Sequence, residues 1–313
     1  MTWGGVYEEN QYKAFFDPFT QDTGIKVTAV SPMNLARVLA AARSGKMDVD
    51  CFTANSMELA RARRANVIIP IDWSIVKKEG RRKEEINEHG LGYQTLSTQL
   101  VYNPTKFPGG QGPQSWADFW DVRRFPGRRS LYKDVKSAIT YALLADGLSF
   151  DRLYPLDVDR AFASLDRVKP HITVWWEQGN QSQQLFRDSE VDMMAMWNGR
   201  ATDLEKAGVP ITQVWNEAIL HISHYQVTRG GPNPKGAMLL AEYFGRPDLQ
   251  AHWATIMWYG PLQEKAYDYI DAETARRLPS HPDNIKTQVI PDDEWWAVNH
   301  DPVNERFQAW LAS

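Results

Sequence analysis

Met-Met-Ala-Met-Trp-Asn-Gly-Arg, at residues 193–200, carries the clearest structural signal in the chain. The first four residues are apolar and predict one short buried strand, which stops at Trp197, Asn198 and Gly199. An amphipathic pattern starts at once with Ala201 and predicts a helix. A strand that turns directly into a helix is where α/β proteins place ligands. The stretch therefore predicts an α/β fold with a ligand site at this turn.

The side chains at this turn suit a small organic ligand. Trp197 offers a flat apolar wall, Asn198 offers donors and acceptors, and Gly199 allows close backbone approach. Arg200 falls in the first turn of the helix, and its guanidinium suits a carboxylate. A buried Trp at a strand end beside a surface Arg fits this window equally well.

The composition bounds the size and class of the protein. The chain has 313 residues, which suits two lobes better than one ordinary core. A net charge of −4 gives no reason to expect nucleic acid or an anionic membrane as a partner. The sequence has no apolar run of roughly 18 residues, so no transmembrane helix is expected. No signal peptide is visible, so the chain is expected to be either cytoplasmic or a trimmed mature domain.

The residue types argue for ligand binding rather than for catalysis. Cys51 is the single cysteine, which excludes an intramolecular disulfide and a cysteine-based metal cluster. His221 and His224 would point to opposite faces of a strand, so no metal site and no cofactor are expected. No sequence motif of a hydrolase, a P-loop or a zinc protease is present, so no catalytic residue is predicted. The 13 Trp, 12 Tyr and 12 Phe residues favour a cleft that stacks on a ligand.

Short apolar runs alternate with helical patterns along the whole chain, which indicates α/β architecture. Helices are expected at 8–20, 34–42, 56–66, 76–90, 157–170, 178–188, 233–243 and 247–258, and from 115, 134 and 201 onward, with Ser115 and Asp134 as helix caps. Strands are expected at 24–30, 49–52, 93–103, 130–132, 172–176, 191–197, 209–215 and 220–227.

The Pro- and Gly-rich stretch at 104–113 predicts a crossover between two lobes, and the chain is expected to return near residue 226. The predicted lobes are 1–104 plus 227–268, and 105–226 plus 269–313. This discontinuous layout predicts a ligand cleft between the lobes.

Several segments, in this order and spacing, resemble bacterial extracellular solute-binding proteins of ABC importers, and above all the spermidine/putrescine-binding type. They are Phe-Thr-Gln-Asp-Thr-Gly-Ile-Lys-Val at 19–27, Ser-Trp-Ala-Asp-Phe-Trp at 115–120, Met-Trp-Asn-Gly at 196–199, and the region from Gly236 to Pro261.

The resemblance implies a two-lobe, Venus-flytrap fold of the periplasmic-binding-protein type II class, with discontinuous lobes that close on one small molecule. It also implies no enzymatic activity, a monomer, and docking on an ABC permease in the inner membrane. A periplasmic location with a removed export signal follows from the same resemblance.

The chain departs from the polyamine pattern at its acidic positions. Trp3 and Trp197 match ligand-wall positions of the family, but the family's acid near the first strand falls on Gly5. Two further acids fall near Asp134 and Ser137, and the acid of the return strand falls near Ile222 and His224. Because Lys133, Arg200 and His224 stand near these positions, an anion or a zwitterion is expected instead of a diamine.

We therefore expect a small carboxylate, either an ω-amino acid or a dicarboxylate, that pairs with Arg200. An amino group of the ligand would stack on Trp3 or Trp197 or reach Asp134. Thr53 and Asn55 precede a predicted helix, so they either bind a carboxylate at its N-terminus or only cap the helix. A polyamine-binding protein of the same fold is the alternative, and an enzyme that uses the same cleft is the alternative of another class.

Overall fold

The computed structural model describes residues 1–82 and 86–313, and these residues form two compact units. Unit 1 comprises Met1–Thr95 and His221–His281, and unit 2 comprises Leu96–Leu220 and Pro282–Ser313. The boundaries of these units differ from those expected after residues 104, 226 and 268. Two strands, β3 (Leu91–Tyr102) and β7 (Thr212–Thr228), run without interruption from one unit into the other. A boundary inside a continuous strand leaves no shift in composition that a sequence could reveal.

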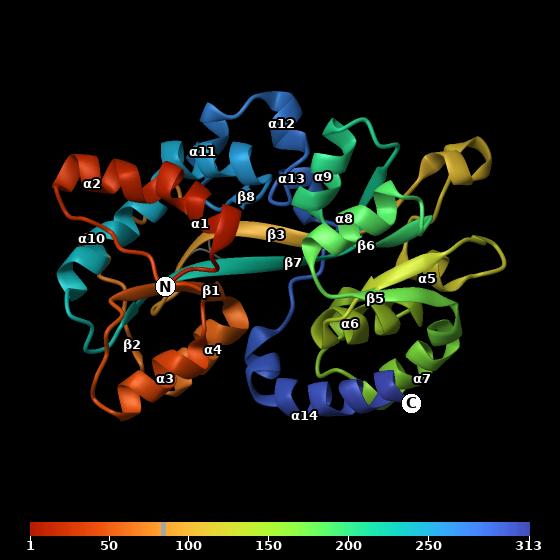
Figure 1. The fold of residues 1–313 in the computed structure, drawn as a ribbon, viewed down its shortest axis with the longest axis horizontal. Coiled ribbons are helices and arrows are strands. Elements are labelled where there is room, and N and C mark those ends of the chain that lie inside the picture. The colour runs from red at the N-terminus through yellow and green to blue at the C-terminus, as the bar shows by residue number, and fades with distance from the viewer. Residues whose placement is uncertain (83–85) are drawn as a thin grey trace. The chain divides into compact units, whose positions relative to one another are not determined.

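Unit 1 combines the first half of β3 and the second half of β7 with three other strands and with helices (Figure 1). Its other strands are β1 (Cys51–Asn55), β2 (Ile68–Ile69) and β8 (Gly260–Pro261). Its helices are α1 (Gly5–Gln11), a π-helical stretch (Tyr12–Phe16), α2 (Asp17–Thr23), α3 (Leu35–Arg43), α4 (Ser56–Arg64), α10 (Pro234–Phe244), α11 (Pro247–Met257), a 3₁₀ stretch (Glu264–Tyr269) and α12 (Ala272–Arg276).

Two apolar clusters lie on the two faces of the unit 1 sheet. Phe52 and Ala54 of β1 pack with Val38 and Leu59, which come from α3 and α4. The other cluster is larger and aromatic. Its members come from the N-terminal helices, β3, β7, α10 and α11, and include Phe15, Phe19, Tyr93, Tyr225, Phe244 and Trp253. Figure 1 shows α3 and α4 on one face of β1 and β7, with α1, α2, α10 and α11 on the other.

Unit 2 is built around a parallel arrangement of strands. Its strands are the second half of β3, β4 (Arg129–Tyr132), β5 (Ile172–Trp176), β6 (Met193–Trp197) and the first half of β7. Its helices are α5 (Trp116–Trp120), α6 (Val135–Ala145), α7 (Val158–Val168), α8 (Gly179–Arg187), α9 (Asn198–Lys206), α13 (Pro282–Ile285) and α14 (Asp293–Ala312), with short 3₁₀ turns at Pro104–Lys106, Pro108–Gly110, Phe150–Arg152 and Lys169–His171.

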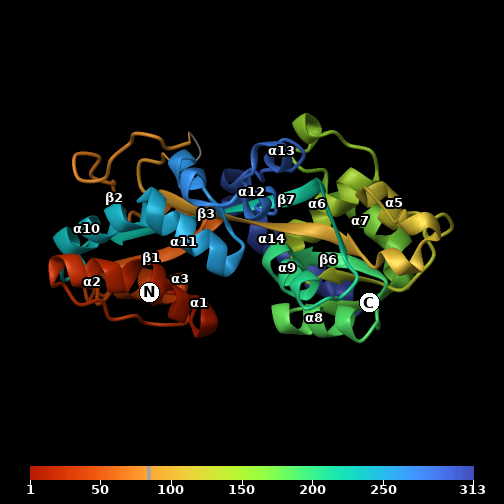
Figure 2. The same cartoon turned by 90° about the horizontal axis from the view of Figure 1, so that it is seen from above.

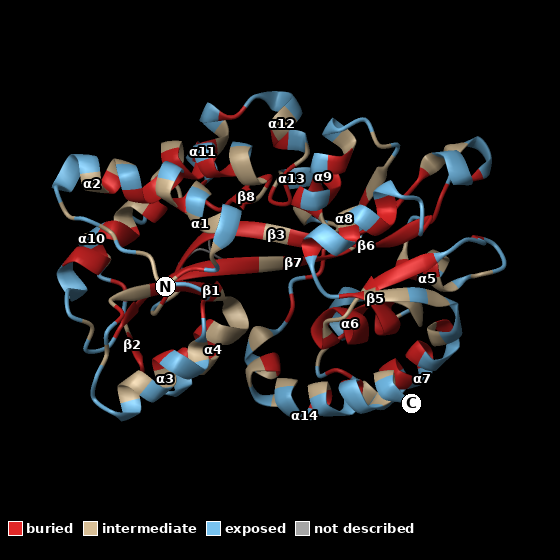
Figure 3. Cartoon of the chain, in the orientation of Figure 1, coloured by how far each residue is buried: buried red, intermediate tan, exposed pale blue. Residues whose placement is uncertain are grey.

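The strands of unit 2 follow the order β3-β6-β4-β5. β4 is parallel to both β5 and β6, whereas β3 is antiparallel to β6. Helices α8 and α9 lie side by side on one face of these strands (Figures 1 and 2). Helix α6 is buried along nearly its whole length, as its red colour in Figure 3 shows. The buried ammonium of Lys136 on α6 pairs with Asp293 of α14 at 2.9 Å.

Many predicted elements are present, and several start at the cap that the sequence indicates. Strand β5 covers the predicted residues 172–176, and β6 runs directly into α9. Ser115 accepts a hydrogen bond from the Asp118 N–H and so caps α5. Asn34 likewise accepts from the Arg37 N–H and caps α3.

Four predictions about the elements of the chain and their connections are wrong. Residues 24–30 form no strand, and the Ala29 N–H donates to the Tyr12 hydroxyl at 3.1 Å instead of to a neighbouring strand. Within the predicted helix at 76–90, the described residues 76–82 and 86–90 form turns and isolated bridges, while residues 83–85 lie outside the described part of the chain. The Pro- and Gly-rich stretch at 104–113 forms 3₁₀ turns inside unit 2 and is no crossover.

The fourth wrong prediction splits β7 into two strands at 209–215 and 220–227. The polar residues between these two ranges suggest a break in the strand, but Glu217 among them forms hydrogen bonds with the neighbouring helix α5. The Glu217 carboxylate accepts from the Trp116 N–H at 2.7 Å, and the Glu217 carbonyl accepts from the Trp116 indole at 2.9 Å. The strand therefore continues through this polar stretch because α5 satisfies its polar groups.

Among residues 1–82 and 86–313, no helix is both long enough and apolar enough to cross a membrane.

Candidate ligand-binding site

The carboxyl ends of three parallel strands meet along one edge of the unit 2 sheet. β4 ends at Tyr132, β5 ends at Trp176 and β6 ends at Trp197, and β4 lies between the other two. In open α/β sheets, ligands bind outside the carboxyl ends of parallel strands. The residues at and just after these three ends therefore form the candidate site, which we call the strand-end site.

The three terminal aromatic residues pack on one another. The Tyr132 ring stacks on Trp176 with ring centroids 4.3 Å apart. Trp197 meets both rings edge-on, with each pair of centroids 5.4 Å apart. Trp176 is fully buried and donates its indole N–H to the Ala195 carbonyl at 2.9 Å, whereas Trp197 is half-buried. The first two rings thus support the third, which remains accessible to a ligand.

A helix begins directly after each of these strand ends. Asp134 caps α6, while α8 and α9 begin without a side-chain cap. The N–H groups in the first turn of a helix and the positive end of its dipole favour an anion. α8 and α9 therefore contribute partial positive charge at the edge where the strands end.

Arg200 is exposed in the first turn of α9 and reaches toward α8. Its Nη1 lies 3.5 Å from the Gln183 side-chain oxygen, and its carbonyl accepts from the Gln183 amide at 3.2 Å. Gly179 makes this position possible, because a Cβ there would lie 2.8 Å from Arg200 Nε and 2.9 Å from Trp197 Cζ3. One glycine thus sets the places of both the guanidinium and the tryptophan ring.

Lys133 and Asp134 follow β4 and are both held by neighbours in unit 2. The Lys133 ammonium lies 2.7 Å from a carboxylate oxygen of Glu177, which follows β5. The Asp134 carboxylate accepts from the backbone N–H and the hydroxyl of Ser137, at 2.8 and 2.7 Å. Both of these bonds end on Oδ2 of Asp134. Asp134 is therefore a helix cap, as the sequence predicts.

Asn198 is fully buried and has a structural role. Its side-chain oxygen accepts from the Ser97 N–H at 2.9 Å, and its carbonyl accepts from the Thr202 hydroxyl at 2.9 Å. The bond from Ser97 fastens the start of α9 to β3, and the bond from Thr202 lies within α9. The prediction that Asn198 offers its amide to a ligand does not fit this burial.

The predicted site residues of unit 1 occupy different surroundings. Trp3 is 42% exposed, although the neighbouring Thr2 is buried. Gly4 and Gly5 follow with φ angles of 84° and 58°, a region that glycine adopts without strain. These two glycines turn the chain into α1 and leave the Trp3 ring at the surface of unit 1.

Asn55 caps a helix, and Thr53 is buried. The Asn55 side chain accepts from the Glu58 N–H at 2.9 Å while Glu58 accepts from the Asn55 N–H at 3.2 Å, which is a capping box. Of the two roles open to Asn55, the structure shows capping. Thr53 is 3% exposed, and its hydroxyl has no hydrogen-bond partner among the described residues.

His224 is buried and neutral, which contradicts its predicted role as a basic group. The side chain is 4% exposed, and burial lowers the pKa of its imidazole to about 4. Its Nδ1 lies 3.5 Å from the Ser56 hydroxyl. An uncharged imidazole cannot attract an anion, so the basic side chains that remain are Arg200 and Lys133.

The structure brings Lys133, Asp134, Trp197 and Arg200 to one edge of unit 2, whereas Trp3, Thr53, Asn55 and His224 belong to unit 1. Sequence reasoning missed Tyr132, Trp176, Glu177 and Gly179. A signal for the first two was present, because each is an aromatic residue that ends a predicted strand just before a helix, as Trp197 does.

A family model described as "Bacterial extracellular solute-binding protein" matches residues 14–280. A gamma-aminobutyric acid (GABA)-binding protein of Pseudomonas aeruginosa is 32% identical over all of this chain and 90% of its own length. A solved GABA receptor is also 32% identical and superposes with a TM-score of 0.93 over 99% of this chain and 96% of that one. The spermidine/putrescine-binding periplasmic protein of Escherichia coli is 23% identical over 89% of this chain and 81% of its own length.

The match to the family model covers most of the chain and includes β6 and the start of α9. The α/β architecture with two compact units agrees with this match. The chain therefore belongs to the bacterial extracellular solute-binding protein family.

Proposed function

We propose that this protein captures a small zwitterionic ω-amino acid, of which GABA is the best candidate, for an ABC importer. The observation that carries this proposal is the balance of charge at the strand-end site. Arg200 and Lys133 are cations, Asp134 and Glu177 are anions, and all four follow the parallel strands β4, β5 and β6. A ligand with one carboxylate and one ammonium group matches a set whose formal charges cancel.

The carboxylate of the ligand pairs with Arg200, whose planar guanidinium suits bidentate contact. The uncapped first turns of α8 and α9 add N–H donors on the same side of the sheet. Gln183 steadies the guanidinium, and Gly179 leaves the space that it occupies. These features support the carboxylate half of the proposal.

The ammonium group of the ligand has two kinds of partner. Oδ1 of Asp134 remains for it, because both bonds from Ser137 end on Oδ2. The face of Trp197 attracts a cation through its ring quadrupole.

A polyamine is the second candidate, because a polyamine binder is among the relatives. A diamine carries two positive charges and would need a site with a surplus of carboxylates. The four charged side chains named above carry no such surplus, since their formal charges cancel and Glu177 is already paired with Lys133 at 2.7 Å. A dicarboxylate would instead need a surplus of cations, which the four charged side chains Lys133, Asp134, Glu177 and Arg200 do not provide.

We further propose that the chain acts as a receptor without catalysis. It would work in the periplasm as a monomer and deliver its ligand to a permease of the inner membrane. The relatives named above are described as binding proteins or receptors, which supports this assignment.

The experiment that tests the proposal is isothermal titration of GABA into the wild-type protein and two variants. Arg200→Ala removes the guanidinium and is expected to weaken binding by at least roughly tenfold, since charge-assisted hydrogen bonds contribute about 1.5–3 kcal/mol. Lys206→Ala removes a cation from the far end of the same helix and is expected to leave the affinity unchanged. Equal affinities of wild type and Arg200→Ala for GABA would refute the assigned role of Arg200.

A further inference from the structure

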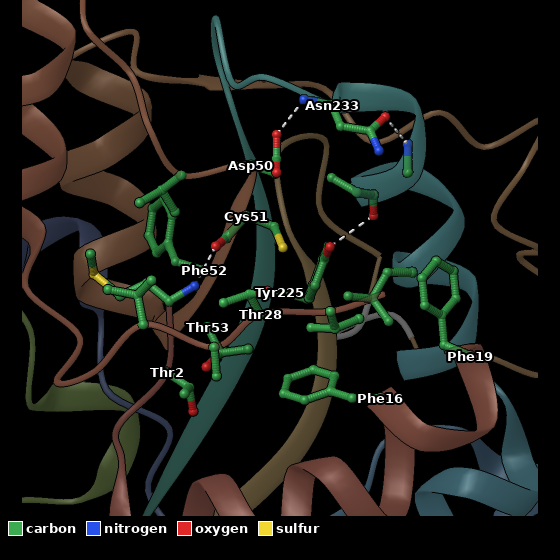
Figure 4. A pocket seen from close by; sticks show the side chains of 18 of the residues that line it. Thr2, Phe16, Phe19, Thr28, Asp50, Cys51, Phe52, Thr53, Tyr225 and Asn233 are labelled. Atoms are coloured by element: carbon green, nitrogen blue, oxygen red, sulfur yellow. Dashed lines mark hydrogen bonds between the residues drawn. The ribbon is translucent and has the colours of Figure 1, made fainter. Parts of the chain in front are cut away.

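The hydroxyl of Tyr132, at the end of β4, has no hydrogen-bond partner among the described residues. Other tyrosines whose rings are enclosed do have one. The hydroxyl of Tyr225, which lines a pocket of unit 1 (Figure 4), donates to the Ala237 carbonyl at 2.8 Å. The hydroxyl of Tyr154 accepts from the Trp296 indole at 2.9 Å. Because a tyrosine that is largely enclosed usually finds a partner for its hydroxyl, Tyr132 points to a partner outside this chain.

The Tyr132 hydroxyl is fixed in place and accessible to a ligand. Its ring stacks on the fully buried Trp176 with ring centroids 4.3 Å apart, which holds the hydroxyl in position. The residue as a whole is half-buried, and its oxygen does not belong to the buried polar atoms that lack a partner in the described part of the chain. The oxygen is therefore neither bonded nor buried, and a ligand at the strand-end site can reach it.

Tyr132 and Asp134 lie on the same side of the chain. Residues 132–134 continue in extended conformation, since the Lys133 N–H donates to the Trp176 carbonyl at 2.8 Å and Asp134 has a φ of −127° and a ψ of 123°. In an extended segment, residues two positions apart share one face. Tyr132 therefore lies beside Asp134, while Lys133 points to the other side and pairs with Glu177.

The charge of Asp134 keeps the Tyr132 hydroxyl neutral. Burial raises the pKa of this hydroxyl, and the neighbouring Asp134 carboxylate raises it further. A neutral phenol oxygen has lone pairs that accept hydrogen bonds. Two oxygen acceptors thus lie next to each other after β4, the Tyr132 hydroxyl and Oδ1 of Asp134, which the bonds from Ser137 leave available.

The aromatic rings of the strand-end site form one wall and not a cage. A cage binds a quaternary ammonium group between several ring faces, each within about 6 Å of the cation. Tyr132 and Trp176 instead turn their faces to each other, at an interplanar angle of 20°. Trp197 is nearly perpendicular to both, with its centroid 5.4 Å from each, so one of its faces covers the edges of that stack. These three rings enclose no void, and they offer a ligand cation the other face of Trp197.

We propose that the Tyr132 hydroxyl and Oδ1 of Asp134 together accept hydrogen bonds from a primary ammonium group of the ligand, so that the site selects ω-amino acids over their N-trimethylated betaines. This inference rests on the proposed function. A primary ammonium has three N–H donors, whereas a trimethylammonium group has none. A betaine would cover both oxygens with methyl groups and leave them without a partner, which is unfavourable.

The test is isothermal titration with three ligands, which are GABA, 4-(trimethylammonio)butyrate and butyrate. Wild type is expected to bind GABA at least roughly tenfold more tightly than the trimethylated compound. Tyr132→Phe keeps the ring stack and removes the hydroxyl, and we expect it to weaken binding of GABA by roughly tenfold. We expect the same variant to bind the other two ligands as wild type does, because neither can donate an N–H to Tyr132.

Tyr102→Phe is the matched control. It removes a phenol hydroxyl at the opposite edge of the same sheet, where Tyr102 pairs with Met193 at the start of β6. We expect this variant to bind GABA as tightly as wild type. The Tm of Tyr132→Phe is expected to equal that of wild type, since no described residue bonds to the lost hydroxyl.

Equal affinities of wild type and Tyr132→Phe for GABA would overturn the inference. An equal loss of affinity for GABA and for butyrate in Tyr132→Phe would also overturn it, because altered packing would then be the cause. Wild type that binds the trimethylated compound as tightly as GABA would contradict the predicted selectivity. Binding of GABA that depends on Arg200 but not on Tyr132 would leave the proposed function intact, whereas wild type that binds no GABA would overturn both.

Discussion

Gly179 determines the positions of the two side chains on which the carboxylate half of the site depends. It is the first residue of α8, and a methyl group there would meet Arg200 Nε at 2.8 Å and Trp197 at 2.9 Å. Contacts of this kind force a neighbour to move, and catalytic or binding groups tolerate little displacement. The sequence alone does not distinguish this glycine from an ordinary helix start.

Gly179→Ala is expected to lower the affinity for GABA by roughly tenfold, through displacement of Arg200, with little change in Tm. Titration calorimetry and a thermal melt measure the two quantities. Gln184→Ala, an exposed position on the same helix, serves as the control for a general effect of substitution in α8. Unchanged affinity of Gly179→Ala for GABA would show that the Arg200 guanidinium can bind the ligand without the space that Gly179 leaves.

His224 predicts a dependence of stability on pH. Burial lowers its pKa from 6.5 to about 4, so the unfolded chain binds the proton first as the pH falls. The stabilisation from the neutral imidazole is therefore complete above pH 6.5 and is lost progressively between pH 6.5 and about 4. The loss across this window is about 3 kcal/mol.

Denaturant unfolding of wild type and His224→Gln at several pH values measures this effect. The variant is expected to lose less stability than wild type between pH 6.5 and 4. His221→Gln on the same strand is the matched control. Parallel pH profiles for wild type and His224→Gln would exclude the buried imidazole as the cause.

At the scale of elements, the strand-end site depends on how α6, α8 and α9 begin. Asp134 satisfies the first turn of α6, while the first turns of α8 and α9 have no side-chain cap. The N–H groups at a capped helix end already have a partner, so the cap of α6 contributes to stability. The N–H groups at an uncapped end can bind a ligand anion, so the first turns of α8 and α9 can contribute to binding.

Asp134 has two roles in this account, and two substitutions separate them. Asp134→Asn keeps the cap but removes the charge, so we expect nearly full stability and weaker binding of GABA. Asp134→Ala removes both the cap and the charge, and we expect it to lower the free energy of unfolding by about 1 kcal/mol more than Asp134→Asn does. Undiminished affinity in Asp134→Asn would place the ligand ammonium elsewhere.

At the scale of the whole molecule, local chemistry made much of the fold predictable. The abrupt end of β6 at Trp197, the Ser115 cap and the Asp134 cap each act within a few residues, and each is found where expected. Non-local pairing was not predictable. Residues 24–30 have a strand pattern but lack a neighbour in the sheet, and Glu217 is polar within β7 because α5 uses it.

The residues of the candidate site also fall into two groups, those that local sequence predicts and those that depend on contacts between distant parts of the chain. Arg200 and Trp197 follow from the strand-to-helix turn, so the sequence suffices for them. Glu177 neutralises Lys133 from a separate strand, and Gly179 makes room for a side chain on another helix. Burial of His224 and Asn198 depends on the complete packing of each unit, which no local pattern encodes.

The most direct test of the zwitterion assignment is titration of wild-type protein with four compounds that share a four-carbon chain. They are GABA, putrescine, succinate and butyrate, which differ only in their charged ends. The charge balance of the strand-end site predicts tight binding of GABA, weaker binding of butyrate and succinate, and no measurable binding of putrescine. Putrescine binding as tightly as GABA, or more tightly, would contradict the account.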